Sequence, residues 1–227
     1  MRQDDAQGDK PLKTRSGHGI DVAVRRGDYL DGSAIRQIKS LMAGRGTARA
    51  LDAACAGGGQ ARRMARAGAA VTAVDLHSDG AALLRAAADE GLTQFDFVQA
   101  DLRDPDLYRR LGQFDLIIAQ RFIHYLPFPD AIDVVRLFRH ALLPEGRLYL
   151  SASGLRSALG QQYGGAVHIT ERFAPLWQPM ADKHGIHDKV CLYEEGDMQA
   201  LLDAGGMRVE KLYASPFGNL KCIARPA

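Results

Sequence analysis

Four acidic or amide side chains each follow a short apolar run, namely Asp52, Asp75, Asp101 and Gln120. The runs have the length and composition of buried strands, and helical patterns separate them. In a parallel α/β sheet the carboxyl ends of the strands meet at one edge, where ligands bind. Carboxylates there can accept hydrogen bonds from ligand hydroxyls or face a positively charged ligand group. The spacing therefore predicts a polar ligand site along that edge.

The run that ends near Asp52 leads into a loop of small residues, and a helical pattern begins at Gln60. The stretch is typical of a strand, a tight turn and a helix. Small residues let the backbone approach a ligand closely, and the first N–H groups of a helix can hold an anion. We expect a ligand to contact Ala54, Cys55, Ala56, Gly57 and Gly58.

The hydrophobic pattern also predicts the elements that place these residues. Strands are expected at 48–53, 70–75, 95–99, 114–119, 146–151, 208–214 and 219–224. Helices are expected from a cap at Asp31 or Ser33 to Gly44, and at 60–67, 82–90, 105–111, 130–143 and 198–204. Alternating strands and helices favour a parallel sheet covered on both faces, and the short link at 215–218 favours an antiparallel last pair.

Composition limits the classes of protein to consider. Hydrophobic residues make up 46% of 227 residues, which is enough for one large core, and the net charge of +2 favours neither nucleic acid nor membrane. Three widely spaced cysteines fit reduced thiols, and no signal peptide or membrane span is apparent, so we expect a cytoplasmic protein. We expect a monomer or homodimer that binds neither nucleic acid nor membrane.

The stretches that lack the alternation of expected strands and helices indicate the domain organisation. Residues 1–19 are polar and without periodicity, so we expect a disordered arm followed by a single domain over 20–227. Residues 152–190 interrupt the alternation and are expected to form an insertion that covers a substrate. The candidate substrate contacts are Tyr29, Tyr163, His168, Trp177 and His187.

The position of Asp52 distinguishes between nucleotide ligands. A dinucleotide fingerprint begins directly after the strand, whereas here a carboxylate stands ahead of the first small residue. A ligand with a positive charge near the turn explains this acid, and the sulfonium and ammonium groups of S-adenosylmethionine supply one. The acid at Asp75, about 20 residues beyond the turn, suits the hydroxyls of a ribose.

On these motifs the chain resembles the class I S-adenosylmethionine-dependent methyltransferases. The segment from Asp52 to Gly58 resembles their acid-x-Gly-x-Gly-x-Gly motif, with alanine at two of the glycine positions. Further resemblance lies in Val74-Asp75-Leu76, Asp101-Leu102, Phe114-Asp115-Leu116-Ile117, His124-Tyr125-Leu126 and Leu142-Leu143-Pro144-Glu145-Gly146-Arg147-Leu148. The resemblance implies a Rossmann-like three-layer α/β/α sandwich with a mostly parallel seven-stranded sheet and an antiparallel last strand.

The resemblance also implies roles for individual residues. Asp75 would hold the ribose, with Leu76 beside it, the Asp101-Leu102 edge would meet the adenine, and Gln120 would complete the cofactor contacts. Because the left-handed conformation costs alanine about 1–2 kcal/mol, we expect Ala54 and Ala56 to keep negative φ or to leave the tight turns to Gly57–Gly59.

The expected reaction is methyl transfer to a small molecule by in-line displacement, driven mainly by alignment. His124 is the candidate proton acceptor, with an orienting or packing role as the alternative. The segment Ala119-Gln120-Arg121-Phe122 lacks the Asn/Asp-Pro-Pro-Tyr/Phe motif of DNA amino-methylating enzymes. His184 and His187 show no third ligand, so no metal is expected. Two alternatives stay open, a nicotinamide-dependent oxidoreductase and a non-catalytic cofactor-binding module.

Overall fold

The computed structural model describes residues 12–13, 20–21, 27–165 and 168–227. Leu12–Lys13 (β1) and Ile20–Asp21 (β2) form a short antiparallel pair. Most of the arm expected at 1–19 lies outside the described residues, so its disorder stays a prediction. Within the described part of the chain, no helix combines the length and apolarity needed to cross a membrane.

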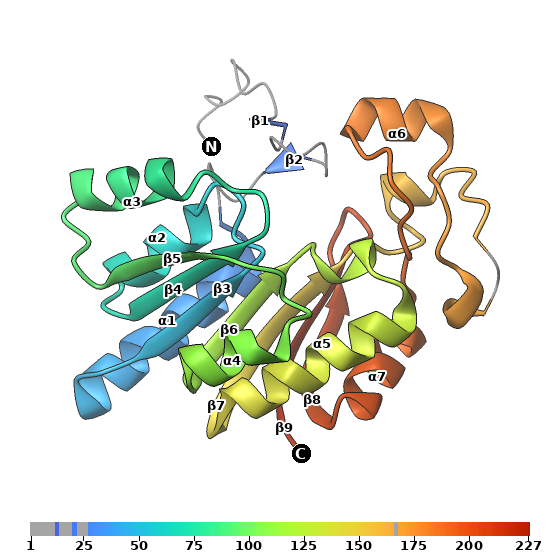
Figure 1. The fold of residues 1–227 in the computed structure, drawn as a ribbon. Coiled ribbons are helices and arrows are strands. Elements are labelled where there is room, and N and C mark those ends of the chain that lie inside the picture. The colour runs from blue at the N-terminus through green and yellow to red at the C-terminus, as the bar shows by residue number, and fades with distance from the viewer. Residues whose placement is uncertain (1–11, 14–19, 22–26, 166–167) are drawn as a thin grey trace, which may run out of the picture.

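One sheet of seven strands organises the structure, with the strand order β5-β4-β3-β6-β7-β9-β8 (Figure 1). Its strands are β3 (Arg49–Ala53), β4 (Ala70–Asp75), β5 (Phe95–Gln99), β6 (Phe114–Gln120), β7 (Leu142–Ala152), β8 (Met207–Ala214) and β9 (Leu220–Pro226). Only β9 is antiparallel to its neighbours in this sheet. The predicted fold class is confirmed, including the antiparallel last strand.

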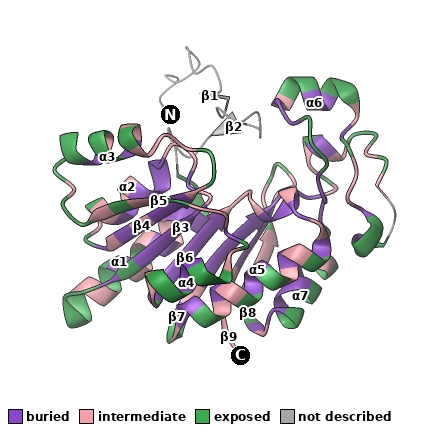
Figure 2. Ribbon diagram, in the orientation of Figure 1, coloured by how far each residue is buried: buried purple, intermediate pink, exposed green. Residues whose placement is uncertain are grey.

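Helices cover both faces of this sheet (Figure 1). They are α1 (Tyr29–Arg45), α2 (Gly59–Arg66), α3 (Gly80–Asp89), α4 (Pro105–Leu111), α5 (Phe128–Ala141), α6 (Gln178–His184) and α7 (Glu195–Ala204). Alternate residues of β6 point to opposite faces. Leu116 and Ile118 pack in one core cluster with α1, α2 and α3, and Ile117 packs in the other with α4, α5 and α7. The buried strands between the two helix layers are visible in Figure 2.

Two predicted helix boundaries are wrong. The α1 helix begins at Tyr29 because Asp28 caps it: its carboxylate accepts from the Leu30 N–H at 2.7 Å, and Asp31 accepts from the Asp28 N–H at 2.6 Å. The expected cap at Asp31 or Ser33 therefore lies inside the helix. The α5 helix ends at Ala141, and Pro144 lies in the following strand rather than at the helix end.

The segment 152–190 leaves the sheet after β7 and carries the short α6 helix, which stands beyond the β6–β9 half of the sheet (Figure 1). It has a small apolar cluster of its own, in which Leu159, Leu176 and Ile186 are buried. Directly after the segment, the Cys191 N–H donates to the His124 carbonyl at 2.8 Å, in the turn that follows β6. The segment therefore lies where an insertion could cover the carboxyl ends of these strands.

Candidate active site

A cleft of about 1320 Å³ lies along the carboxyl ends of β3, β4, β5 and β6. The α1 start, the insertion and the β8–β9 hairpin complete its walls. The cleft brings together all the predicted cofactor residues except Gly58: Asp52, Ala54, Cys55, Ala56, Gly57, Asp75, Leu76, Asp101, Leu102 and Gln120. Gly58 lies behind the turn, where an added Cβ would come within 2.6 Å of Leu83 Cδ2.

The turn after β3 adopts a strained conformation. Ala54 and Ala56 have φ values of 58° and 45°, and Gly58 has a φ of 69°. The expectation that the alanines would avoid the left-handed region is therefore wrong. Hydrogen bonds to β4 and to the loop after it hold the turn. The Cys55 N–H donates to the Val74 carbonyl at 3.1 Å, and Ser78 Oγ donates to the Ala56 carbonyl at 2.7 Å.

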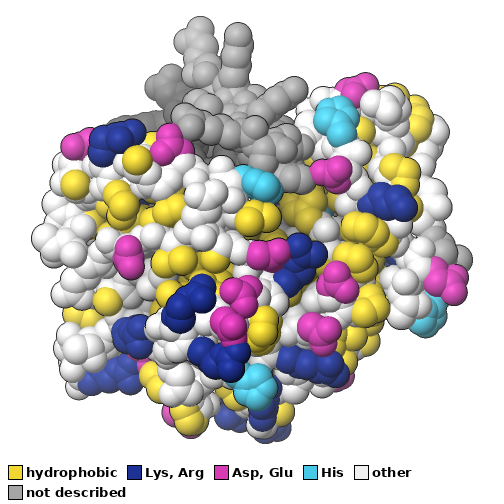
Figure 3. Space-filling view, in the orientation of Figure 1, with side chains coloured by type: hydrophobic (Ala, Val, Ile, Leu, Met, Phe, Trp, Pro, Cys, Tyr) yellow, Lys and Arg dark blue, Asp and Glu magenta, His cyan; other side chains and the backbone are white. Residues whose placement is uncertain are grey.

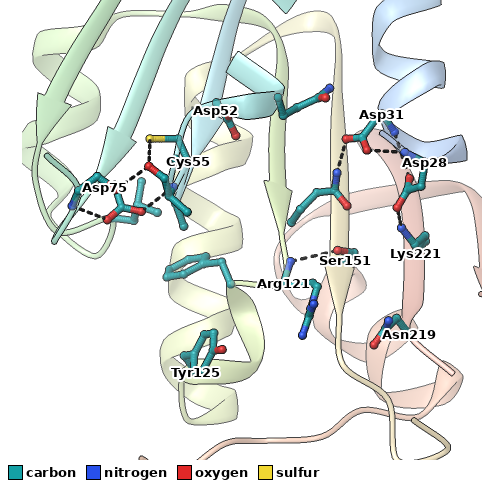
Figure 4. Close-up of a pocket in the computed structure, with 18 of the residues that line it drawn as sticks. Asp28, Asp31, Asp52, Cys55, Asp75, Arg121, Tyr125, Ser151, Asn219 and Lys221 are labelled. Atoms are coloured by element: carbon teal, nitrogen blue, oxygen red, sulfur yellow. Dashed lines mark hydrogen bonds and ion pairs between the residues drawn. The ribbon is translucent and has the colours of Figure 1, made fainter. Parts of the chain in front are cut away.

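The side chain of Asp75, at the end of β4, holds both the turn after β3 and the loop after β4 in place. Its Oδ2 accepts from the Ala56 N–H at 3.0 Å, and its Oδ1 accepts from the N–H groups of His77 and Ser78 at 2.9 and 3.0 Å. Figure 4 shows this carboxylate beside Cys55 at one end of the site. Oδ1 already accepts two hydrogen bonds, but Oδ2 accepts only one, so its further lone pair can still accept from a ligand hydroxyl.

Two buried carboxylates flank the middle of the cleft. Asp52 is 4% exposed and Asp31 is 3% exposed (Figure 4). Burial raises the pKa of Asp31, although hydrogen bonding from the Asp28 backbone opposes the shift. Gln120 Nε2 donates to Asp31 Oδ1, which holds the two side chains together. A site with two desolvated acids favours a cationic ligand group, whose charge would offset their burial.

The first turn of α2 adds a donor that sequence reasoning missed. Gln60 is 3% exposed and lines the cleft. Its Oε1 accepts from Arg63 Nε at 2.8 Å, while its Nε2 has no hydrogen-bond partner among the described residues. A buried amide donor beside a helix N-terminus suits an anionic ligand group such as a carboxylate.

The far end of the cleft is formed after β5. Asp101 pairs with Arg103 at 2.6 Å, and this hydrogen-bonded guanidinium lowers the pKa of Asp101. The neighbouring Leu102 is buried, and its carbonyl accepts from the Tyr108 hydroxyl at 2.7 Å. With Leu83 and Ala86 from α3, these residues offer a partly apolar surface to a flat ring.

His124 does not line the cleft. Its side chain is fully buried on the one-turn helix η1 (Ile123–Tyr125), with its ring centroid 4.3 Å from that of Tyr125. Burial, assisted by the charge of Arg121, lowers the pKa of His124 to about 3. A histidine in this position is neutral near pH 7 and is out of reach of a ligand in the cleft. The geometry favours the alternative of a packing histidine.

Of the predicted substrate residues, only Tyr29 lines the cleft. It is the first residue of α1, and its hydroxyl accepts from Lys211 at 2.9 Å. The Tyr163 hydroxyl instead donates to the Arg172 and Val190 carbonyls within the insertion. His168 and His187 are exposed, and Trp177 caps α6. Sequence spacing could not separate these residues from the ones that face the cleft.

One side of the cleft, which we call the acceptor side, is lined by residues from three segments. The insertion contributes Ser157, Leu159 and His184, the turn after β6 contributes Arg121, Phe122 and Tyr125, and the β8–β9 hairpin contributes Tyr213, Phe217, Asn219 and Lys221. Lys221 forms an ion pair with Asp28 (Figure 4). The described residues contain no group of three or more metal-ligating side chains. On the face shown in Figure 3, basic and acidic side chains are interspersed rather than gathered by sign.

The fold and the cleft together are typical of one class of protein. A mostly parallel sheet with acids at the carboxyl ends of three adjacent strands, beside a small-residue turn, is typical of proteins that bind nucleoside-containing ligands. The antiparallel β9 and the buried Asp52 distinguish this chain from a plain dinucleotide-binding fold.

Part of the chain is similar to a known family of proteins. Residues 50–146 match the family described as "Methyltransferase domain". A ubiquinone biosynthesis O-methyltransferase of Xanthomonas oryzae pv. oryzae is 35% identical over 104 residues, which are 46% of this chain and 42% of that protein. The chain thus matches less than half the length of this relative.

Solved structures agree on the fold. The CcbJ methyltransferase of Streptomyces caelestis gives a TM-score of 0.66 at 15% identity, covering 95% of this chain and 99% of that one. A Burkholderia thailandensis 1,6-didemethyltoxoflavin-N1-methyltransferase, solved with S-adenosylhomocysteine, gives 0.60 at 22% identity, covering 88% and 80%. The chain therefore has the fold of these methyltransferases, and its residues 50–146 match a methyltransferase domain, in agreement with the motifs.

Proposed function

We propose that this chain binds S-adenosylmethionine in the cleft and transfers its methyl group to a small-molecule acceptor. The observation that carries the proposal is the arrangement of three carboxylates. Asp75 presents a lone pair of Oδ2 at the end of β4, while Asp52 and Asp31 lie buried beside the β3 turn. One acid suits a ribose and two suit a cation, which is the combination that this cofactor offers.

The residues present fit the cofactor along its length. Asp101, Leu102, Leu83 and Ala86 would hold the adenine, and Asp75 with Leu76 would hold the ribose. Asp52 and Asp31 would face the cationic groups, and the unpartnered Gln60 Nε2 would meet the carboxylate. The small side chains of Ala54, Ala56 and Gly57 leave the backbone of the turn open to close approach.

When bound, the cofactor would supply a methyl group on a sulfonium, which is already activated for in-line displacement by the acceptor. The chain's own part is to align the two reactants and to exclude water, which can supply about 7–11 kcal/mol of the barrier reduction in favourable cases. Leu159 and His184 of the insertion and Phe217 of the hairpin would enclose the acceptor. The buried, neutral His124 takes no part in this step.

The methyltransferase match and the buried Asp52 favour methyl transfer over a nicotinamide-dependent oxidoreductase. Titration calorimetry of the full chain with S-adenosylhomocysteine and with NAD(P) tests the choice, and we expect heat of binding only with the first. Tight binding of NAD(P) alone would refute the proposal. A cofactor-binding module without catalysis would bind S-adenosylhomocysteine but would consume no S-adenosylmethionine with any of a panel of phenols, amines and carboxylic acids.

A variant tests the ribose contact. Asp75→Asn keeps the side-chain shape but removes the charge and replaces one acceptor oxygen with a donor. We expect affinity for S-adenosylhomocysteine to fall about 10- to 100-fold, the usual loss for hydrogen bonds to a charged group. Asp89→Asn, on the exposed end of α3, is the matched control and should bind as the wild type does. Equal affinity in both variants would remove Asp75 from the site.

A further inference from the structure

We infer that Arg121 is the anion-binding residue of the acceptor side and that the methyl acceptor is an apolar compound carrying a carboxylate. This inference rests on the proposed function, because it concerns the same cleft. It starts from the conformation of Arg121, whose φ is 53°, in the left-handed region. Its N–H donates to both the carbonyl and the Oγ of Ser151, each at 3.0 Å. Such strain at a site residue persists only where surrounding contacts enforce it.

Arg121 lines the cleft. Its Nε is buried and has no hydrogen-bond partner, and no carboxylate among the described residues forms an ion pair with it. Arg103, which also lines the cleft, has Asp101 as its partner. A partly buried cation without an anion is costly, so an anionic ligand group would be favoured beside it.

Two further polar atoms of this side lack partners within the described structure. Ser157 Oγ and His184 Nε2 are both buried, and both residues line the cleft. Burial lowers the pKa of His184, and the charges of Lys183 and Arg121 add to this effect, so Arg121 lies within electrostatic reach of His184. A planar guanidinium with a hydroxyl and a neutral imidazole can bind the oxygens of a carboxylate.

The surroundings describe the rest of the acceptor. Phe122, Leu126, Leu159 and Phe217 line the same side of the cleft and supply apolar contact. Figure 4 shows Arg121 near the middle of the view, between Tyr125 and Asn219, with Asp75 at the left. The cofactor carboxylate has its own candidate donor in Gln60, which leaves Arg121 for the acceptor.

The test uses the full chain saturated with S-adenosylhomocysteine. Calorimetry with 2-naphthoate and 2-naphthamide compares two probes of one shape that differ in charge. We expect 2-naphthoate to bind at least tenfold more tightly, and Arg121→Gln to abolish this preference without weakening S-adenosylhomocysteine. The control Arg85→Gln, on the exposed face of α3, should keep the preference.

Each other outcome has a definite meaning. Equal binding of the two probes to the wild type, or a preference kept by Arg121→Gln, would overturn the inference. Weaker S-adenosylhomocysteine binding in Arg121→Gln would assign the guanidinium to the cofactor and would also overturn it. Inorganic phosphate that competes as well as 2-naphthoate would show a subsite for free oxyanions instead. If S-adenosylhomocysteine does not bind the wild type at all, the proposed function fails rather than this subsite.

Discussion

The two ends of the cleft are built in different ways. At the cofactor end, each loop directly follows its own strand: residues 54–58 follow β3, 76–79 follow β4 and 100–103 follow β5. At the acceptor end, the turn after β6 meets residues that are distant from it in sequence, in the insertion and the β8–β9 hairpin. Local sequence therefore determines the first end, whereas tertiary contacts determine the second.

Close packing at the acceptor end shows this dependence. An added Cβ at Gly218, whose φ is 74°, would come within 2.4 Å of the Arg156 carbonyl oxygen, so the hairpin tip sits directly on the insertion. The insertion is in turn anchored by buried Arg172, whose Nη1 donates to the Leu192 carbonyl at 3.0 Å and contacts Asp197 at 2.5 Å. Loss of one such anchor should affect the acceptor end while leaving the cofactor end in place.

The largest expected effect tests the acceptor end through pH. Buried His124 has a pKa of about 3 instead of 6.5, so below pH 6.5 the unfolded chain binds more protons than the folded chain. Stability therefore falls as pH falls through this window, by about 1.4 kcal/mol per pH unit for one such group. Between pH 6 and pH 4, we expect urea unfolding to show a loss about 2–3 kcal/mol larger in the wild type than in His124→Gln.

The matched control is His168→Gln, because His168 is an exposed histidine, on the insertion. Its pH dependence should follow that of the wild type. Parallel pH profiles for the wild type and His124→Gln would contradict the assignment of His124 as a buried neutral histidine. In that case a role in the cleft would have to be considered again.

The next effect tests the rigidity of the cofactor end. Gly58→Val must adopt a φ near 69° and must also displace Leu83, whereas Gly91→Val faces a φ near 70° with nothing within 4 Å. Both variants bear the left-handed cost, so their difference isolates the crowding, which we expect to be about 1–3 kcal/mol in unfolding free energy. Gly58→Val should also weaken S-adenosylhomocysteine binding. Equal stability and affinity in the two variants would show that the turn tolerates movement.

The sequence allowed more residues to be predicted at the cofactor end than at the acceptor end, for physical reasons. Strand ends, glycine turns and the acids after them are local features, so Asp52, Asp75 and Asp101 could be placed before the structure was known. Asp31 was considered only as a helix cap, because a sequence does not show that the α1 start meets Gln120 at the sheet edge. Residues of the insertion have no periodic pattern, so His184 could not be preferred over His187.

A smaller effect separates the groups of the cofactor. Asp31→Asn removes one of the two buried charges but keeps the shape of the side chain. If this acid faces the ammonium group, affinity for S-adenosylhomocysteine should fall about tenfold, equivalent to about 1.4 kcal/mol. Affinity for methylthioadenosine, which lacks the amino-acid end, should stay unchanged. Equal losses for both ligands would instead indicate a general disturbance of the α1 start.

The smallest effect concerns the turn itself. Ala54 and Ala56 both occupy the left-handed region, which costs alanine about 1–2 kcal/mol, while glycine adds about 0.5–1 kcal/mol of unfolded-state entropy. Ala56→Gly should therefore stabilise the chain by about 0.5–1 kcal/mol in urea unfolding. Ala43→Gly, in the exposed last turns of α1, should destabilise it by a similar amount. Destabilisation by both changes would mean that contacts of the Ala56 methyl group outweigh its backbone strain, and the cofactor end would then depend on packing as the acceptor end does.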